Sequence, residues 1–151
     1  MESHLLDTIF RLGSAALVGV CIGLNRDLMN KPLGMRTLGL VAVGAAVISL
    51  AAMEVEGIAG YPDAVSRVLQ GIIQGVLTGI GFIGAGVILR DPDSHHVEGI
   101  TTAASVWVTA ALGVACALAA WRIVAVGVVI VLVLLVLIAW LEKRMSGIKG
   151  P

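Results

Sequence analysis

Charged residues are scarce in this chain, and aromatic residues and cysteines are scarcer still. Only 13% of the 151 residues are charged, whereas a soluble domain carries about 25%. Acidic and basic residues cancel to a formal net charge of zero, so no global field attracts nucleic acid, and we expect no such partner. The two cysteines, Cys21 and Cys116, each lie in an apolar run, which indicates packing residues rather than a disulfide or a metal pair.

Apolar residues dominate the composition instead, at 58% of the chain with a mean hydropathy of +1.02. A helix needs about 20 apolar residues to cross a bilayer, and five runs reach or approach that length. We therefore predict an all-α integral membrane protein in which residues 1–151 form a single transmembrane domain. The five helices are expected at residues 5–24, 37–53, 68–89, 100–120 and 123–141.

The ends of the chain add two expectations. The N-terminus lacks the basic stretch of a signal peptide, so the first apolar run is expected to be retained. Because the sequence stops ten residues after the last run, we expect no soluble C-terminal domain.

Basic residues are unevenly divided between the two sides of the predicted bundle. Seven of the ten fall in the first and third connections and the tail: Arg26, Lys31, Arg36, Arg90, Lys143, Arg144 and Lys149. By the positive-inside rule, this side is cytoplasmic together with the C-terminus, and the N-terminus is outside. The connection that carries Glu54, Glu56 and Asp63 is then external as well.

Glycines at four-residue spacing predict close helix packing, because small residues let two helix backbones approach. The candidate packing positions are Gly19, Gly23, Gly71, Gly75, Gly79, Gly81, Gly84 and Gly86. The density of glycine over residues 81–86 leaves a second interpretation open, a locally unwound helix that lines a cavity. The residues around Arg26 and Arg90 also resemble each other, which suggests a parallel repeat of helices 1–2 and 3–4.

Polar side chains recur every four residues on two of the predicted helices. Helix 3 carries Gln70, Gln74 and Thr78, and helix 4 carries Thr101, Ser105 and Thr109. One interpretation is a hydrated path or binding groove between the two helices. The other is ordinary hydrogen bonding between helices.

Charges near the membrane are costly, so each one is informative. Asp7 and Arg11 are one helical turn apart and are expected to pair. The expected cytoplasmic boundary of helix 1 is marked by Asn25, Arg26 and Asp27. Helix 2 starts with a cation beside Thr37, which the helix dipole disfavours, so we expect Asp27 to balance Arg36. The connection over residues 90–98 clusters carboxylates and imidazoles, but the spacing fits no metal motif, and no metal ligand is assigned.

Two segments resemble the MgtC/SapB family of bacterial inner-membrane proteins. One covers residues 23–37, GLNRDLMNKPLGMRT; the other covers 79–88, GIGFIGAGVI, and continues at 99–107, GITTAASVW. The resemblance transfers the family's characteristic positions to Arg26, Gly34, Arg36, Gly81, Gly84, Gly86, Thr102 and Trp107. The sequence departs from the family at Asn25, where many members have an acidic residue. The resemblance implies a link to growth in low magnesium and, in pathogens, to virulence.

Two functions follow as hypotheses. In the first, a homo-oligomer, most simply a dimer, serves magnesium homeostasis and transports an ion or small polar solute past Asp27 and the hydroxyls of helix 4. In the second, a regulator without transport activity binds another membrane complex, such as an ion pump or an ATP synthase, through its glycine face. Since no nucleophile and base, zinc motif or phosphate loop occurs, we expect no enzyme activity and no cofactor.

Overall fold

The computed structural model describes residues 2–54, 60–90 and 97–146. It contains five helical spans that are long and apolar enough to cross a membrane, which confirms the predicted fold class. The first four are α1 (Glu2–Leu28), α2 (Met35–Met53), α3 (Pro62–Val87) and α4 (Ile100–Ala117). The fifth span joins α5 (Trp121–Val133), the π-helical segment Leu134–Ile138 and α6 (Ala139–Ser146). A ribbon of two short strands, β1 (Leu89–Arg90) and β2 (Val97–Glu98), precedes α4.

All five helices differ from the prediction by a few residues at one or both ends, and three of the differences bear on the fold. α1 continues past Leu24 to Leu28, so its last turn is polar but still helical. α3 begins six residues earlier than expected, because Pro62 occupies the first turn, where its missing N–H is harmless, and Asp63 complements the helix dipole. α4 ends earlier than expected, because Ala119 has a positive φ of 54° and turns the chain.

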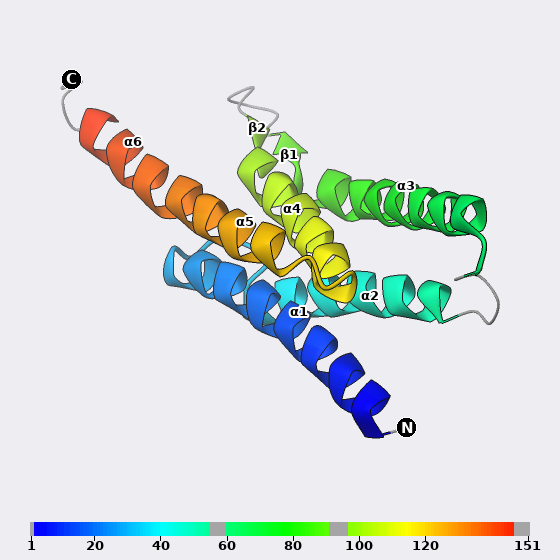
Figure 1. Cartoon of the computed structure of the whole chain (residues 1–151). Coiled ribbons are helices and arrows are strands. Elements are labelled where there is room, and N and C mark those ends of the chain that lie inside the picture. The colour runs from blue at the N-terminus through cyan, green and yellow to red at the C-terminus, as the bar shows by residue number, and fades with distance from the viewer. Residues whose placement is uncertain (1, 55–59, 91–96, 147–151) are drawn as a thin grey trace.

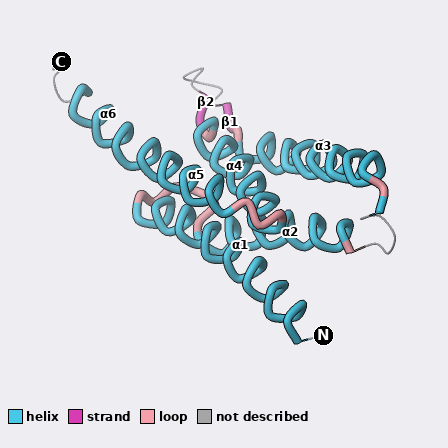
Figure 2. Tube along the Cα trace, in the orientation of Figure 1, coloured by secondary structure: helices cyan, strands magenta, loops and turns pink. Residues whose placement is uncertain are grey.

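α4 is the central helix of the bundle. It contacts α1, α2, α3 and α5. Of its apolar stretch, 56% of the residues are buried inside the protein, against 11–33% in the other four spans. Figures 1 and 2 show α4 between α5 and α3, with its end in front of α2 and the two termini at opposite ends of the molecule. The core therefore lies where α1, α2 and α4 meet, around Ile22, Leu38 and Val106.

Glycines bring the backbones of these three helices together. A Cβ at Gly19 would collide with the backbone of Leu38, and one at Gly23 would collide with Met35. One turn further along the same face of α2, a Cβ at Gly113 would collide with the backbone of Ala42. α2 is thus packed against α1 and α4 at distances that only glycine permits.

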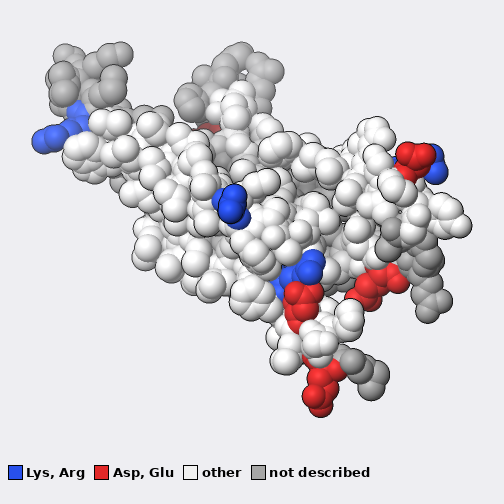
Figure 3. Space-filling view, in the orientation of Figure 1, with Lys and Arg blue, Asp and Glu red and all other residues white. Residues whose placement is uncertain are grey.

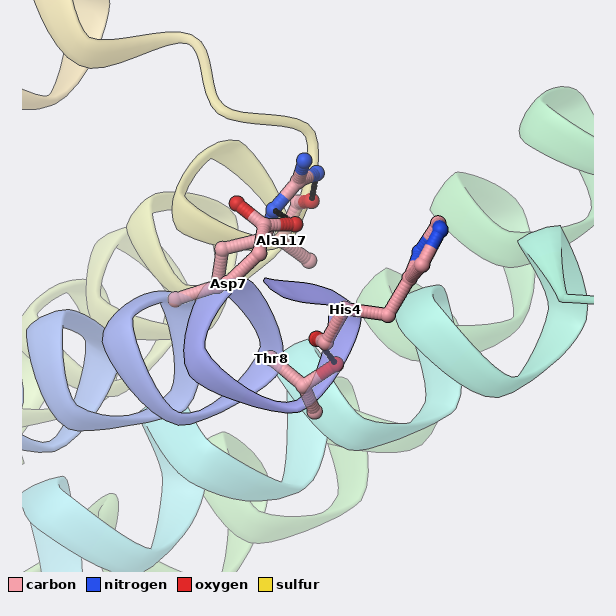
Figure 4. A network of polar contacts seen from close by, with 5 residues as sticks. His4, Asp7, Thr8 and Ala117 are labelled. Atoms are coloured by element: carbon pink, nitrogen blue, oxygen red, sulfur yellow. Dashed lines mark hydrogen bonds and ion pairs between the residues drawn. The ribbon is translucent and has the colours of Figure 1, made fainter. Parts of the chain in front are cut away.

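The expected pair of Asp7 and Arg11 is present near the start of α1 (Figure 4). Arg11 Nε lies 2.7 Å from Asp7 Oδ2, and Arg11 Nη1 donates a 2.7 Å hydrogen bond to the carbonyl of Ala117 at the end of α4. Arg11 is one-quarter exposed and Asp7 about half exposed. The pair therefore fastens the start of α1 to the end of α4 at the edge of the bundle.

The structure does not confirm the predicted repeat of helices 1–2 and 3–4. In the first pair, Gly19 and Gly23 of α1 meet the backbone of the next helix. In the second pair, only Gly84 of α3 comes near α4, with Ala103 as its neighbour. The two pairs pack differently, and the short β ribbon separates only the second.

The first prediction tests the close approach of α1 to α2. Gly19→Ala places a Cβ against the backbone of Leu38 and is expected to lower the free energy of unfolding by about 1–3 kcal/mol. Gly13→Ala is the matched control in the same helix, because a Cβ there meets nothing within 4 Å and helix propensity improves. Unfolding in detergent, followed by tryptophan fluorescence, measures the free energy of unfolding of both variants. Equal stability of the two variants would contradict the packing role of Gly19.

Candidate functional site

A polar junction forms where the end of α1 meets the starts of α2 and α4. Arg26 is buried at 4% exposure, and its Nη2 donates a hydrogen bond to Thr102 Oγ1 in the first turn of α4. Asp27 accepts a 3.0 Å hydrogen bond from the backbone N–H of Met35. The structure thus brings Arg26 to Thr102, 76 residues later in the sequence, and places the neighbouring Asp27 at the start of α2.

This junction corrects the view of residues 25–27 as a simple membrane boundary. Because α1 stays helical to Leu28, Arg26 points into the bundle instead of outward to water. Arg26 Nε and Asn25 Oδ1 are both buried and have no hydrogen-bond partner among the described residues. A guanidinium keeps its charge when buried, so its unsatisfied N–H group is costly unless something pairs with it.

Asp27 has a different role from the one expected of it. Its carboxylate caps the first turn of α2 through the Met35 N–H, and the described residues show no ion pair to Arg36, which is exposed. A carboxylate at a helix N-terminus is stabilised by the dipole and by an otherwise unpaired N–H group. Gly34 leaves room for this cap, because a Cβ there would overlap the Asp27 carboxylate.

The hydroxyls of α4 are used inside the helix. Ser105 Oγ donates to the carbonyl of Thr101 at 2.8 Å, and Thr109 Oγ1 donates to the carbonyl of Ser105 at 2.7 Å. Ser105 and Thr109 are buried, whereas the side chain of Thr101 is exposed.

The polar side chains of α3, Gln70, Gln74 and Thr78, are all exposed. Among the described residues, none of them hydrogen-bonds to the hydroxyls of α4. The two polar stripes therefore do not combine into one path within a single chain.

An apolar groove of about 670 Å³ lies between α2 and α3. Both of its walls contain glycine: Gly44 on α2, and Gly71, Gly75 and Gly79 on α3. A Cβ at any of these four positions would meet nothing within 4 Å. Thr37 lines the end of the groove at the start of α2. In this chain, then, the expected packing stripe of α3 is an open surface.

The remaining glycines of α3 lie outside the groove. Gly81 and Gly86 also face open space, and Gly84 contacts Ala103 at ordinary van der Waals distance. The whole of residues 81–86 is helical, which answers the question of a locally unwound segment.

The part of the chain that the structure describes contains no group of three or more histidine, cysteine or acidic residues placed to hold a metal ion. Most of the acidic and histidine-containing connection, residues 91–96, lies outside the described residues. Both cysteines are free thiols, and Cys116 is buried.

Comparison with known proteins matches the sequence model of the MgtC family to residues 12–144. The chain belongs to the MgtC family. Protein SrpB of Synechococcus elongatus is 43% identical over 124 residues, which cover 78% of this chain and 67% of SrpB. Protein MgtC of Salmonella typhimurium is 36% identical over 148 residues, or 97% of this chain and 59% of that protein. Protein SapB of Bacillus subtilis is 30% identical over 143 residues, with 93% and 60% covered.

This MgtC-family chain spans about 59–67% of the length of these relatives. No solved structure matches it. The comparisons and the five spans together establish a multi-pass membrane protein of this family.

Sequence reasoning found the residues of the junction but missed the groove. The glycine spacing of α3 was visible, yet spacing alone does not say whether a partner helix lies in the same chain. Gln70 and Gln74 lie on the opposite face of α3 and do not line the groove, so their spacing gave no signal for it.

The second prediction concerns the contact of Arg26 with α4. Thr102→Val keeps the shape of the side chain but removes the acceptor, so a buried charged donor loses its partner, and the free energy of unfolding is expected to fall by about 3 kcal/mol. Thr101→Val, one residue earlier and exposed, should change it by less than about 0.5 kcal/mol. Denaturation in detergent compares the two. Similar stability of the Thr102 and Thr101 variants would show that the hydrogen bond from Arg26 to Thr102 does not stabilise the fold.

The third prediction concerns the cap of α2. Asp27→Ala is expected to cost about 1 kcal/mol, because the Met35 N–H loses its acceptor. Asp27→Asn retains a side-chain oxygen and should recover most of the loss. Hydrogen exchange of the first turn of α2, read by mass spectrometry, locates the effect. Unchanged exchange in Asp27→Ala would argue against the cap.

Proposed function

We propose that this protein acts in bacterial adaptation to low magnesium as a regulator, by binding a transmembrane helix of another membrane complex in the α2–α3 groove. The observation that carries the proposal is the open, glycine-lined groove itself. The magnesium link rests on the family to which the chain belongs. An ion pump or an ATP synthase is the kind of complex that offers such a helix.

α3 has the features of a helix that lacks a partner on one side. Of its 26 residues, only Ile72 and Gly84 are buried, although the helix spans the membrane. It packs on α4 and diverges from α2, and the groove opens between them. Helices associate in a bilayer mainly through close packing of small residues, so four open glycines favour insertion of another helix.

The length of the groove fits one helix. On α3 its lining runs from Gly71 to Ile83, which corresponds to about 20 Å of helix. This is about two-thirds of the hydrocarbon thickness of a bilayer. A partner helix would therefore contact both walls of the groove over about two-thirds of its membrane-spanning length.

The lining of the groove says what the partner must offer. Its walls consist of glycine, alanine and aliphatic residues, with Thr37 at one end. The polar residues Gln70, Gln74 and Thr78 of α3 do not line it. Helix backbones approach closely where both carry small residues. The expected partner helix therefore has small residues at four-residue spacing on an apolar face.

The transport hypothesis has less support from the geometry. A path for a polar solute needs free polar groups, but Ser105 and Thr109 donate to carbonyls of their own helix and Thr102 is taken by Arg26. The groove itself is apolar and opens sideways between two helices.

The proposed setting is the bacterial inner membrane, with the N-terminus outside and the C-terminus cytoplasmic. In Figure 3 the acidic side chains gather around the start of α1 and the connection of α2 to α3, where Glu2, Asp7, Glu54 and Asp63 lie. Arg26 lies in the last turn of α1, at the other end of that helix from Glu2 and Asp7, and Arg144 lies in α6, at the end of the fifth span. This separation supports the orientation through the positive-inside rule.

The fourth prediction uses a matched pair of glycine variants. Gly75→Leu fills the groove without a clash inside the chain, and Gly81→Leu adds the same side chain to α3 outside the groove. In a strain that lacks the gene, Gly75→Leu should fail to restore growth in low magnesium, whereas Gly81→Leu should restore it. Both proteins should accumulate in the membrane to the wild-type level.

A photo-crosslinking amino acid at Leu40, on the α2 wall, identifies the occupant in the same cells. The proposal requires a crosslink that maps to a transmembrane helix of another protein, persists in Gly81→Leu and disappears in Gly75→Leu. Crosslinks only to a second, differently tagged copy of this chain would replace the regulator hypothesis with a homo-oligomer. Magnesium, sodium, potassium or proton flux in liposomes containing only the purified protein would favour transport and oppose the proposal.

A further inference from the structure

α4 begins at a point where two positive contributions meet. The unpaired N–H groups in the first turn of a helix act together as about half a positive charge. α4 has 18 residues, and its N-cap is Gly99, which has no side chain to accept from these groups. Arg26 adds a full positive charge to the same turn, because its guanidinium bonds to the Thr102 hydroxyl.

At the start of α2, this chain supplies a negative partner for the unpaired backbone N–H groups of the first helical turn. There, the Asp27 carboxylate accepts from the Met35 N–H and places a negative charge on the helix end. Among the residues that the structure describes, no carboxylate does the same for α4, and the one ion pair joins Asp7 to Arg11 at the far end of α1. The negative partner of α4 is therefore missing from the described chain.

The Arg26 guanidinium supplies the second, independent sign of a ligand. The residue is more than nine-tenths buried, and its Nε is buried with no hydrogen-bond partner in the part of the chain that the structure describes. Arginine stays charged in such surroundings, and a charge of this kind is normally found paired. Its five N–H groups form a planar fork that matches the oxygens of a phosphate or carboxylate.

The start of α4 is open on its outer side. Ile100 and Thr101 are exposed, and Gly99 is half-buried. Gly99 has a φ of +89°, and a Cβ there would collide with the carbonyl of Val87, so glycine both makes the turn and leaves the N–H groups uncovered.

We propose that the start of α4 binds a phosphate-type oxyanion, held by the first-turn backbone N–H groups and by the guanidinium of Arg26. Helix N-termini are ready-made sites for such anions, and an adjacent arginine strengthens the interaction. The Thr102 hydroxyl holds Arg26 against the helix and so positions it for the ligand. The site is separate from the α2–α3 groove, and the proposal does not depend on the function assigned to that groove.

Two sources supply this chemistry: free inorganic phosphate, or the phosphate of a phospholipid headgroup. The test begins with inorganic phosphate added to the purified full chain in detergent, with chloride replacing phosphate to keep the ionic strength constant. Saturating phosphate is expected to raise the unfolding midpoint by about 5 °C. A bound phospholipid would instead appear in native mass spectrometry as retained phosphatidylglycerol after reconstitution in vesicles of phosphatidylglycerol and phosphatidylcholine.

Three variants locate the site. Arg26→Gln should abolish the phosphate shift or the lipid retention. Because Arg26→Gln removes a buried contact and can prevent folding, Thr101→Asp gives a second reading at an exposed position. Its carboxylate occupies the helix start, so the unfolding midpoint should rise without phosphate, and the response to either ligand should fall at least tenfold. Lys31→Gln removes an exposed charge on a nearby connection and should leave the response unchanged.

Each result decides the proposal. A phosphate shift lost in Thr101→Asp but kept in Lys31→Gln supports free phosphate as the ligand. No phosphate shift, with phosphatidylglycerol retained by the wild type and lost in Thr101→Asp, supports a lipid headgroup. Neither effect in the wild type, or an effect that survives in Thr101→Asp, would overturn the site.

Discussion

The fold depends on the close approach of α2 to its two neighbours. Gly19 and Gly23 bring α1 against the start of α2, and Gly113 brings α4 against the same face of α2 one turn further along. In a membrane, where apolar side chains gain little by leaving lipid, such backbone contact is the main source of cohesion between helices. Once these three helices are fixed, the end of α1 lies beside the starts of α2 and α4, and Arg26 and Asp27 can reach their partners. The polar junction is thus a product of the glycine contacts.

Much of this architecture follows from the sequence, because a bilayer admits few solutions. Backbone groups must be satisfied inside each segment, so long apolar runs become helices whatever their partners. The ends of the helices were harder to predict, since they depend on local features such as Pro62 or the positive φ of Ala119. The continuation of α1 through Asn25, Arg26 and Asp27 depends on tertiary contacts, which make a polar turn stable inside the bundle.

The candidate sites were predictable to different degrees. Arg26, Asp27 and Thr102 stood out as polar residues near the membrane, but their grouping required the bond that joins α1 to α4. The role of Asp27 was misjudged, because its carboxylate accepts from the Met35 N–H and, among the described residues, forms no ion pair with Arg36. The groove could not be predicted for a different reason. A stripe of glycines predicts close contact with another helix, but in this structure Gly71, Gly75 and Gly79 face an unfilled space between α3 and α2.

The two walls of the groove differ in length, but the difference lies at one end. α2 has 19 residues and spans about 28 Å, close to the hydrocarbon thickness, whereas α3 has 26 residues and spans about 39 Å. The first two turns of α3 are polar and carry Asp63, Ser66 and Arg67. The apolar stretch that follows, residues 68–87, is about 30 Å long. Both walls of the groove therefore match the same bilayer thickness, and a helix of ordinary membrane-spanning length would need no local thinning or thickening of the lipid to lie along them.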